Sequence, residues 1–285
     1  MIVGSQADAY YRALECGAKT EAEKLGVDLT LDGPKSFDTS QQVPIVNGAV
    51  AKKPDAILIA PTGATALFAP LKAASAQGTK IVTVDTELAD TSIVSSAVVA
   101  DFEKEGAMGA DSLNELLGGH GKILAIFSPP GVTTSDLGRK GFEAKIKDYP
   151  ELEVASVQFS NGDPGKSASI VSAAFARYPD LSAVYVFNGG DLEGVVTAVK
   201  EAHKSGDVKV LSNDAQPFQV DLLREGAVSE LILPKPYDIG VAAVQQAVNA
   251  LNDEPVEKRV VTDITLATPQ TMDDPDVSKY FFNAC

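Results

Sequence analysis

The 285-residue sequence predicts an α/β protein with two similar lobes, each built on a doubly wound, mainly parallel sheet. Apolar runs such as AILIA and KILAIF alternate with helical patterns, and continuous apolar runs are typical of parallel strands buried on both faces. One pattern also occurs twice, from Pro54 to Asp85 and from Pro179 to Asp214. Each copy has Pro-Asp, a strand, a polar turn, a helix, a glycine, a second strand and a closing Asp. Two copies far apart in the chain indicate two lobes of the same design.

The first lobe begins with a short strand at residues 1–3. We then expect a helix that ends at Gly26, a residue suited to a left-handed C-terminal cap. The apolar face of this helix has a spacing of three and four residues: Tyr11, Leu14, Ala18, Ala22 and Leu25. The next expected elements are a strand at 27–31, a helix carrying Val43, Val46 and Val50, the first repeat copy and a strand at 93–99.

The same alternation begins again at Asp101. We expect a helix at 103–117, a strand at 122–127, a helix ending near Ile146, a strand at 153–159 and a helix at 166–177. After the second repeat copy come a short helix at 217–224, a strand at 231–233 and a last helix carrying Val241, Val244, Val248 and Leu251. Parallel sheets of this kind bind ligands beyond the carboxyl ends of their strands.

Composition and charge exclude several classes of function. The net charge of −15 argues against binding to nucleic acid, which relies on clustered Lys and Arg. No apolar run approaches the roughly 18 residues that span a bilayer. The chain starts directly with a strand and shows no export signal, which fits either a cytoplasmic protein or an exported one without its signal.

Catalysis is not expected. The sequence has only two histidines, both in polar surroundings, and no GxSxG elbow. Residues 160–167 contain Gly-Lys-Ser but lack the leading glycine of a P-loop, and Asp163 with Pro164 explains the segment as the start of a helix. Neither a cofactor nor a metal is expected, because there is no dinucleotide fingerprint and no Cys/His cluster.

Polar side chains suited to a hydroxylated ligand gather where strands end: Asp8, Asp85, Asp136, Asn188 and Asp214. Carboxylates accept hydrogen bonds from hydroxyl groups, and an Asn both donates and accepts. Lys235 adds a donor between two prolines, and Tyr10 and Tyr11 offer ring faces for C–H surfaces. A second interpretation stays open for single members, because an Asp can cap a helix and a tyrosine can belong to the core.

The two cysteines allow two interpretations. Cys16 lies in the first helix and Cys285 is the last residue. They are either two free thiols or a disulfide that joins the C-terminal tail to the first helix, and a disulfide would indicate an oxidising compartment.

Six segments together resemble the sugar-binding, periplasmic or lipid-anchored substrate-binding proteins of ABC importers, of the ribose-binding type: DAYYRALECGAKTEAEKLGVDL, PDAILIAPT, IVTVDTE, DLGRKGFEAKI, AVYVFNGGDLEGVVTAV and KPYDIG. The resemblance covers nearly the whole chain. It implies two Rossmann-like lobes with three crossings, the type I periplasmic binding fold, with lobes at 1–101 plus 236–265 and at 102–235 plus 266–285. It also implies a monomer without cofactor, located in the periplasm or outside the cell.

The resemblance implies a ligand site made of residues from both lobes: Asp8, Tyr10, Tyr11, Asp85, Thr86, Asp136, Asn188, Asp214 and Lys235. Thr86 stands where hexose and pentose binders often carry Arg, and Asp136 stands where ribose binders usually carry another Arg. Because Arg forks suit vicinal ring hydroxyls, their loss favours a polyol or a less usual sugar over ribose. The excess of carboxylates leaves a cationic ligand as an alternative.

The function implied is capture of a small sugar or polyol by closure of the two lobes around it. A membrane permease of an ABC importer, or a chemoreceptor, would recognise the closed form. The alternative is an effector-binding sensory or regulatory core, as in LacI-type repressors, without its output domain.

Overall fold

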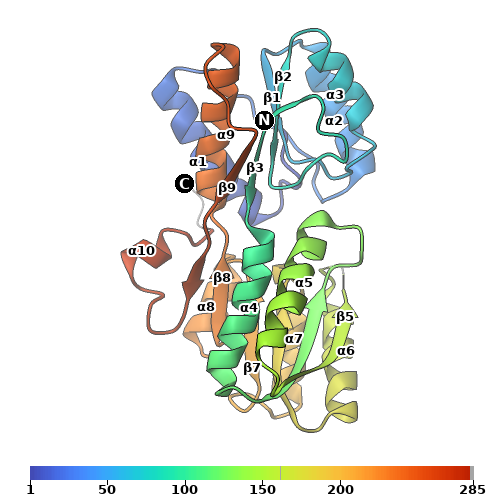
Figure 1. Cartoon of the computed structure of the whole chain (residues 1–285), viewed down its shortest axis with the longest axis vertical. Coiled ribbons are helices and arrows are strands. Elements are labelled where there is room, and N and C mark those ends of the chain that lie inside the picture. The colour runs from blue at the N-terminus through green and yellow to red at the C-terminus, as the bar shows by residue number, and fades with distance from the viewer. Residues whose placement is uncertain (161, 283–285) are drawn as a thin grey trace. The chain divides into compact units, whose positions relative to one another are not determined.

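The computed structural model describes residues 1–160 and 162–282, which divide into two compact units (Figure 1). Unit 1 contains Met1–Ala100, Lys235–Asp263 and Phe282, and unit 2 contains Asp101–Pro234 and Ile264–Phe281. The three crossings expected from the sequence lie within two residues of these boundaries. Phe282 differs, because the sequence placed it with the second lobe. Its ring packs edge-on against Tyr10 of unit 1, with ring centroids 5.6 Å apart.

Unit 1 is a parallel sheet covered on both faces by helices. Its strands, in spatial order, are β1 (Ala56–Ile59), β2 (Lys80–Val84), β3 (Val94–Ala100) and β9 (Arg259–Thr262). Ile2 forms parallel bridges to both Ile59 and Asp32, so the first residues of the chain extend the sheet beyond β1. The helices are α1 (Ala9–Leu25), α2 (Thr39–Ala51), α3 (Phe68–Ser75) and α9 (Pro236–Leu251). In Figure 1, α1 and α9 lie together on one side of this sheet, and α2 and α3 lie on the other.

Unit 2 has a six-stranded sheet in the order β10-β8-β7-β6-β4-β5, and only β10 runs antiparallel to its neighbour. The strands are β4 (Gly121–Phe127), β5 (Leu152–Phe159), β6 (Leu181–Val186), β7 (Lys209–Asn213), β8 (Glu230–Leu233) and β10 (Thr265–Ala267). The α-helices are α4 (Phe102–Leu117), α5 (Thr133–Lys145), α6 (Pro164–Arg177), α7 (Leu192–Glu201), α8 (Pro217–Arg224) and α10 (Pro275–Ser278). Helix α4 packs along α5, and α6 packs along α7 (Figure 1).

Glycines allow α4 and α5 to approach backbone to backbone. A Cβ atom on Gly106 of α4 would lie 1.8 Å from the carbonyl oxygen of Gly138, and one on Gly141 would lie 2.0 Å from that of Glu103. On the other side of α5, a Cβ on Gly138 would lie 2.1 Å from the ring of Phe187. Glycine is therefore required at these positions for α5 to pack between α4 and Phe187.

The predicted α/β fold class is confirmed, and the two repeat copies form β1–α3–β2 and β6–α7–β7. Three local predictions were wrong. The expected strands at 1–3 and 27–31 do not form, since only isolated bridges at Ile2 and Asp32 are present. Leu25 was placed on the buried face of α1 but is 41% exposed, because it lies in the last turn beyond the packed part of the helix. Among the described helices, none is both long and apolar enough to cross a membrane.

Candidate functional site

The closing Asp of each repeat copy has the same unusual backbone geometry. Asp85 follows β2 with φ 61°, and Asp214 follows β7 with φ 75°. Each backbone N–H still donates to the neighbouring strand, to Val98 and Ile232 respectively, at 2.9 Å. Left-handed backbone is uncommon outside glycine, and Asp is among the residues that tolerate it best. Each sheet therefore ends its ladder at this Asp and turns away at once, which places one carboxylate at the same position in each unit.

Asp85 is held by two tyrosines of α1. The Tyr11 hydroxyl donates to Oδ2 at 2.6 Å, and the Tyr10 hydroxyl donates to Oδ1 at 3.1 Å. All three residues are buried, and the two rings meet edge to face with centroids 5.3 Å apart. The structure thus brings together three of the predicted site residues, from segments 74 and 75 positions apart in the sequence.

Burial governs the ionisation of Asp85. Desolvation raises the pKa of Asp85 to about 6, and the nearby Asp8 carboxylate adds to that rise, whereas hydrogen bonds from Tyr11 and Tyr10 oppose it. Burial also raises the pKa of Asp8, against the Tyr10 backbone N–H and the Arg12 charge. Two carboxylates with raised pKa values at one sheet edge are a feature of candidate functional sites.

The side chains of Asp8 and Thr86 both form hydrogen bonds within unit 1. The Asp8 carboxylate caps α1 by accepting from the Tyr10 backbone N–H at 2.9 Å. The Thr86 hydroxyl donates to the carbonyl oxygen of Pro61 at 2.9 Å, which joins the segment after β2 to the segment after β1. Both side chains carry oxygen atoms of the kind that accepts hydrogen bonds from hydroxyl groups.

In unit 2, the structure brings Asn188 and Asp214 to the same edge. Asn188 donates from Nδ2 to Ser128 Oγ at 3.2 Å and accepts from the Gly190 backbone N–H at 3.1 Å, so it links the ends of β4 and β6. The Asp214 carboxylate lies against Gly189, the residue after Asn188, since a Cβ on Gly189 would be 2.8 Å from Asp214 Oδ2. The absence of a side chain at Gly189 is what allows these two strand ends to converge.

Asp136 and Lys235 occupy the starts of helices. Asp136 lies in the first turn of α5, where Oδ2 accepts from the Gly131 backbone N–H at 2.8 Å and Oδ1 lies 3.8 Å from the Arg139 guanidinium. Lys235 is the half-buried residue that precedes α9 in unit 1. The alternative interpretation of Asp136, that it stabilises the start of a helix, matches these contacts.

The cap proposed for the Gly-Lys-Ser segment is present. The Asp163 carboxylate accepts from the backbone N–H groups of Gly165 and Lys166, and Pro164 opens α6. In the described part of the chain, no group of three or more His, Cys, Asp or Glu residues is arranged to hold a metal ion. The two interpretations of the cysteines, free thiols or a disulfide between Cys16 and Cys285, both stay open, because Cys285 lies outside the described residues.

Phe37 belongs to the unit 1 edge and was missed in the sequence. A Cβ on Gly4 would lie 2.5 Å from the Tyr11 hydroxyl oxygen and 2.8 Å from Cε2 of Phe37, so both rings converge over this glycine. Phe37 is 48% exposed, the largest exposed fraction among the big apolar side chains described. One signal in the sequence could have identified Phe37. It stands in the polar segment PKSFD, where a large apolar side chain is not expected to belong to the core and therefore indicates a binding surface.

Gln42 was also missed, and it ties the strand ends of unit 1 together. Its buried amide donates to the carbonyl oxygens of Val3 and Ala60, at 3.0 and 2.8 Å, and its Oε1 accepts from the backbone N–H of Thr62 at 2.8 Å. The Thr62 hydroxyl donates to the same Oε1 at 2.8 Å. One side chain thereby positions the two loops that follow residues 1–3 and β1.

Comparison with known proteins identifies the family of this chain. Residues 1–255 match the family described as "Periplasmic binding protein domain". The chain belongs to the periplasmic binding protein family. The resemblance seen in the sequence is therefore confirmed.

Several relatives are sugar import binding proteins. The ribose import binding protein of Bacillus subtilis is 26% identical over 91% of this chain and 83% of its own length. The D-apiose import binding protein of Actinobacillus succinogenes is 26% identical over 87% of this chain and 79% of its own length. Among solved structures, an ABC transporter solute-binding protein from Agrobacterium vitis with bound α-D-tagatopyranose has a TM-score of 0.93 and 33% identity, covering 99% of this chain and 98% of its own.

Proposed function

We propose that this protein is the solute-binding component of an ABC importer and that its ligand is a small sugar or polyol. The observation that carries the proposal is the pair of closing carboxylates, Asp85 and Asp214, held in left-handed backbone at the same position of two similar sheets. The relatives named above bind or import ribose, apiose and tagatose, which are all polyhydroxylated. We propose the periplasm or cell exterior as the location and a membrane permease as the partner.

The chemistry of the unit 1 edge suits one face of a sugar. The hydroxyl groups of Tyr10 and Tyr11 donate to Asp85, and a phenolic oxygen is also of the chemical type that accepts a hydrogen bond from a ligand hydroxyl. The exposed ring of Phe37 offers an apolar surface for C–H groups beside them. This edge would therefore accept hydrogen bonds from the ligand and cover part of its carbon skeleton.

The chemistry of the unit 2 edge suits another face of the same ligand. The Asn188 amide has a second N–H besides the one given to Ser128, and Asp214 contributes carboxylate oxygens. A ligand that contacts both edges favours the form of the protein in which both contacts exist. We propose that this ligand-dependent form is what the permease recognises.

The test is binding of a panel of sugars, polyols and amines, followed by calorimetry on the best ligand. The panel includes ribose, apiose, tagatose, arabinose, sugar alcohols and spermidine-like amines. A polyhydroxylated hit supports the proposal, whereas binding of amines alone would favour the cationic alternative and overturn it.

Substitution of the unit 2 residues locates the site. Asn188→Ala and Asp214→Ala should each weaken ligand binding by about 1–3 kcal/mol, because a buried ligand hydroxyl loses its partner. Asp253→Ala is the control for Asp214, since Asp253 also has positive φ, 55°, but lies in an exposed turn after α9. Unchanged affinity in both site variants would show that the ligand binds elsewhere.

A further inference from the structure

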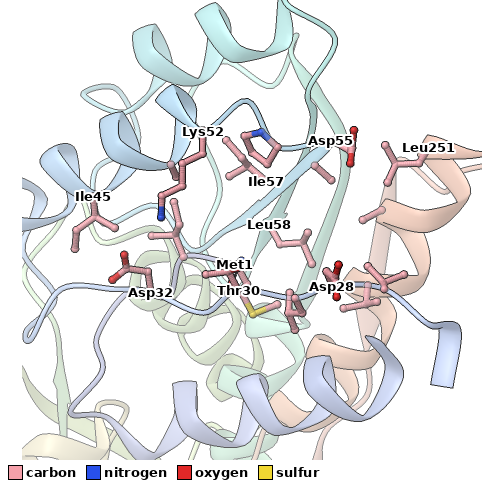
Figure 2. Close-up of a pocket in the computed structure, with 18 of the residues that line it drawn as sticks. Met1, Asp28, Thr30, Asp32, Ile45, Lys52, Asp55, Ile57, Leu58 and Leu251 are labelled. Carbon is pink, nitrogen blue, oxygen red and sulfur yellow. Dashed lines mark hydrogen bonds between the residues drawn. The ribbon is translucent and has the colours of Figure 1, made fainter. Parts of the chain in front are cut away.

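Unit 1 contains a groove of about 610 Å³ that lies away from the candidate sugar-binding residues. Figure 2 shows Met1 in the middle of this groove, with Ile57 and Leu58 of β1 beside it. The groove begins at the amino end of β1, whereas the candidate residues follow the carboxyl ends of strands. The groups that hold the two closing carboxylates in place therefore lie among the hydrogen bonds at the strand ends.

The closing Asp of unit 1 is held by its own turn and by two tyrosines. The carbonyl oxygen of Val84, which precedes Asp85, accepts from the Thr86 backbone N–H at 2.6 Å. The Asp85 carboxylate accepts from the hydroxyl groups of Tyr10 and Tyr11. Hydrogen bonds therefore fix both the backbone and the side chain of Asp85.

The closing Asp of unit 2 has a different support. The carbonyl oxygen of Asn213, which precedes Asp214, accepts from Gln219 Nε2 at 2.8 Å and from Ser212 Oγ at 3.1 Å. The N–H of the same peptide, that of Asp214, donates to Ile232 of β8 at 2.9 Å. Both ends of this peptide are hydrogen-bonded, and its orientation sets the φ of Asp214, 75°.

Gln219 is fully buried in the first turn of α8, and its own side chain is fixed. Its Oε1 accepts from the Gln216 backbone N–H at 2.9 Å, as part of the capping box that begins α8. Its Nε2 also donates to Ser212 Oγ at 3.4 Å. Because both ends of the amide are bonded, any other rotamer would leave buried polar groups unpaired.

The Gln219 amide and the Asp214 carboxylate meet at one glycine. A Cβ on Gly189 would lie 2.9 Å from Gln219 Nε2 and 2.8 Å from Asp214 Oδ2. Gly189 directly follows Asn188, the other candidate ligand residue of this edge. Gln219 therefore packs against the point where both ligand residues converge, and its burial means that it acts through them.

We propose that Gln219 is the positioning residue of the unit 2 edge, because it holds the Asn213–Asp214 peptide in the orientation that presents the Asp214 carboxylate to the ligand. This inference rests on the proposed function for the identity of that ligand. Left-handed backbone is unfavourable for a residue with a Cβ and persists where its surroundings over-determine it. Without Gln219, the peptide rotates toward a more favourable φ and the carboxylate leaves its place.

The first test is the sugar affinity of Gln219→Met, which keeps the length of the side chain and removes its donor and acceptor. Binding should weaken roughly tenfold, since the Asp214 carboxylate no longer meets the ligand hydroxyl. Gln246→Met is the matched control. Gln246 is also a buried glutamine whose Oε1 accepts from a backbone N–H, that of Glu257, but it lies in α9 of unit 1.

The control should lose stability and keep its affinity for the sugar. Unchanged affinity in Gln219→Met would overturn the proposal. Equal weakening in both variants would assign the loss to general destabilisation, which also contradicts a positioning role.

Hydrogen exchange of the Asp214 amide gives a measurement that needs no ligand. In Gln219→Met this amide should exchange roughly tenfold faster, as expected for loss of about one net hydrogen bond. The Phe187 amide is the reference within unit 2, because it donates to Ile126 at another strand end. It should keep its exchange rate. Unchanged exchange at Asp214, or equal acceleration at Phe187, would count against Gln219.

Two further variants decide the outcome if Gln219→Met does not fold. Gln219→Glu keeps an oxygen for the Gln216 N–H and replaces only the nitrogen that bonds Asn213, so it should show the same weaker binding and faster exchange. Ser212→Ala removes the other donor to Asn213 and should have a smaller effect. Wild-type behaviour of Gln219→Glu, or a larger effect of Ser212→Ala, would refute the proposal.

Asp214→Ala, measured with the same sugar, separates this inference from the proposed function. If Asp214→Ala binds as tightly as wild type, the proposed role of Asp214 in the sugar site fails. If Asp214→Ala binds weakly while Gln219→Met binds normally, only the role of Gln219 fails.

Discussion

Asp85 shows how one residue can combine two tasks at the unit 1 edge. Its carboxylate accepts hydrogen bonds from both tyrosine hydroxyls, so it orients Tyr10 and Tyr11. We propose that it also contacts the ligand. Its backbone at φ 61° ends the β2 ladder. A substitution that keeps the shape and removes the charge separates these tasks.

The raised pKa of Asp85, about 6, predicts a pH-dependent stability. Because the unfolded value is about 3.9, the stabilising contribution of protonated Asp85 is fully present below about pH 4 and is lost as pH rises through 6. Asp85→Asn stays neutral, so its stability relative to wild type should increase between pH 4 and 7, by up to about 3 kcal/mol. Denaturant unfolding at several pH values measures this, with Asp253→Asn as a control for left-handed backbone.

Only the change with pH is diagnostic in that comparison, since the Asn side chain also alters the two tyrosine hydrogen bonds. A stability difference that is constant from pH 4 to 7 would show that Asp85 titrates normally.

We predict that Phe37 contributes to sugar affinity through its apolar ring and not through a hydrogen bond. Phe37→Ala should weaken sugar binding roughly tenfold, because it removes the exposed ring beside Tyr11 and leaves the polar groups in place. Leu25→Ala is the control, since Leu25 is similarly exposed, 41% against 48%, at the far end of α1. Calorimetry with the best ligand measures both, and equal affinities would remove Phe37 from the site.

At the scale of elements, the unit 1 edge depends on Gln42 of α2. Gln42→Leu should reduce the free energy of unfolding by about 2–3 kcal/mol, because the buried backbone groups of Val3, Ala60 and Thr62 lose a partner. Gln41→Leu, next to it on the exposed side of α2, should change stability by less than about 0.5 kcal/mol. Chemical denaturation compares the two.

Sugar affinity gives a second measurement for Gln42. Because the side chain positions loops and does not itself reach the candidate carboxylates, Gln42→Leu should weaken binding while Gln41→Leu leaves it unchanged. Equal loss of stability in both variants would contradict the role assigned to Gln42.

At the scale of the whole molecule, each unit has its own sheet and core. We propose that the ligand contacts residues of both units. Ligand at about 100 times its Kd should stabilise the native protein by about 2.7 kcal/mol, by mass action. Differential scanning calorimetry should show that the transitions of both units move to higher temperature. If only one unit were stabilised, the ligand would bind within that unit alone.

The sequence by itself determined most of the elements and the repetition of one design in two units, because these depend on residues close together in the chain. Alternating apolar runs and helical spacing predicted the α/β fold, and the repeated pattern predicted the matching positions of Asp85 and Asp214. Helix caps could be predicted for the same reason. Asp163 accepts from residues two and three positions ahead, and Gly26 has the predicted left-handed φ, 69°.

Only the tertiary structure decided which polar and aromatic side chains meet at the unit 1 edge. Gln42 bonds across 39 positions to Val3, and Tyr10 reaches Asp85 across 75. Such contacts depend on the order of strands in the sheet and on small residues such as Gly4 that let rings approach.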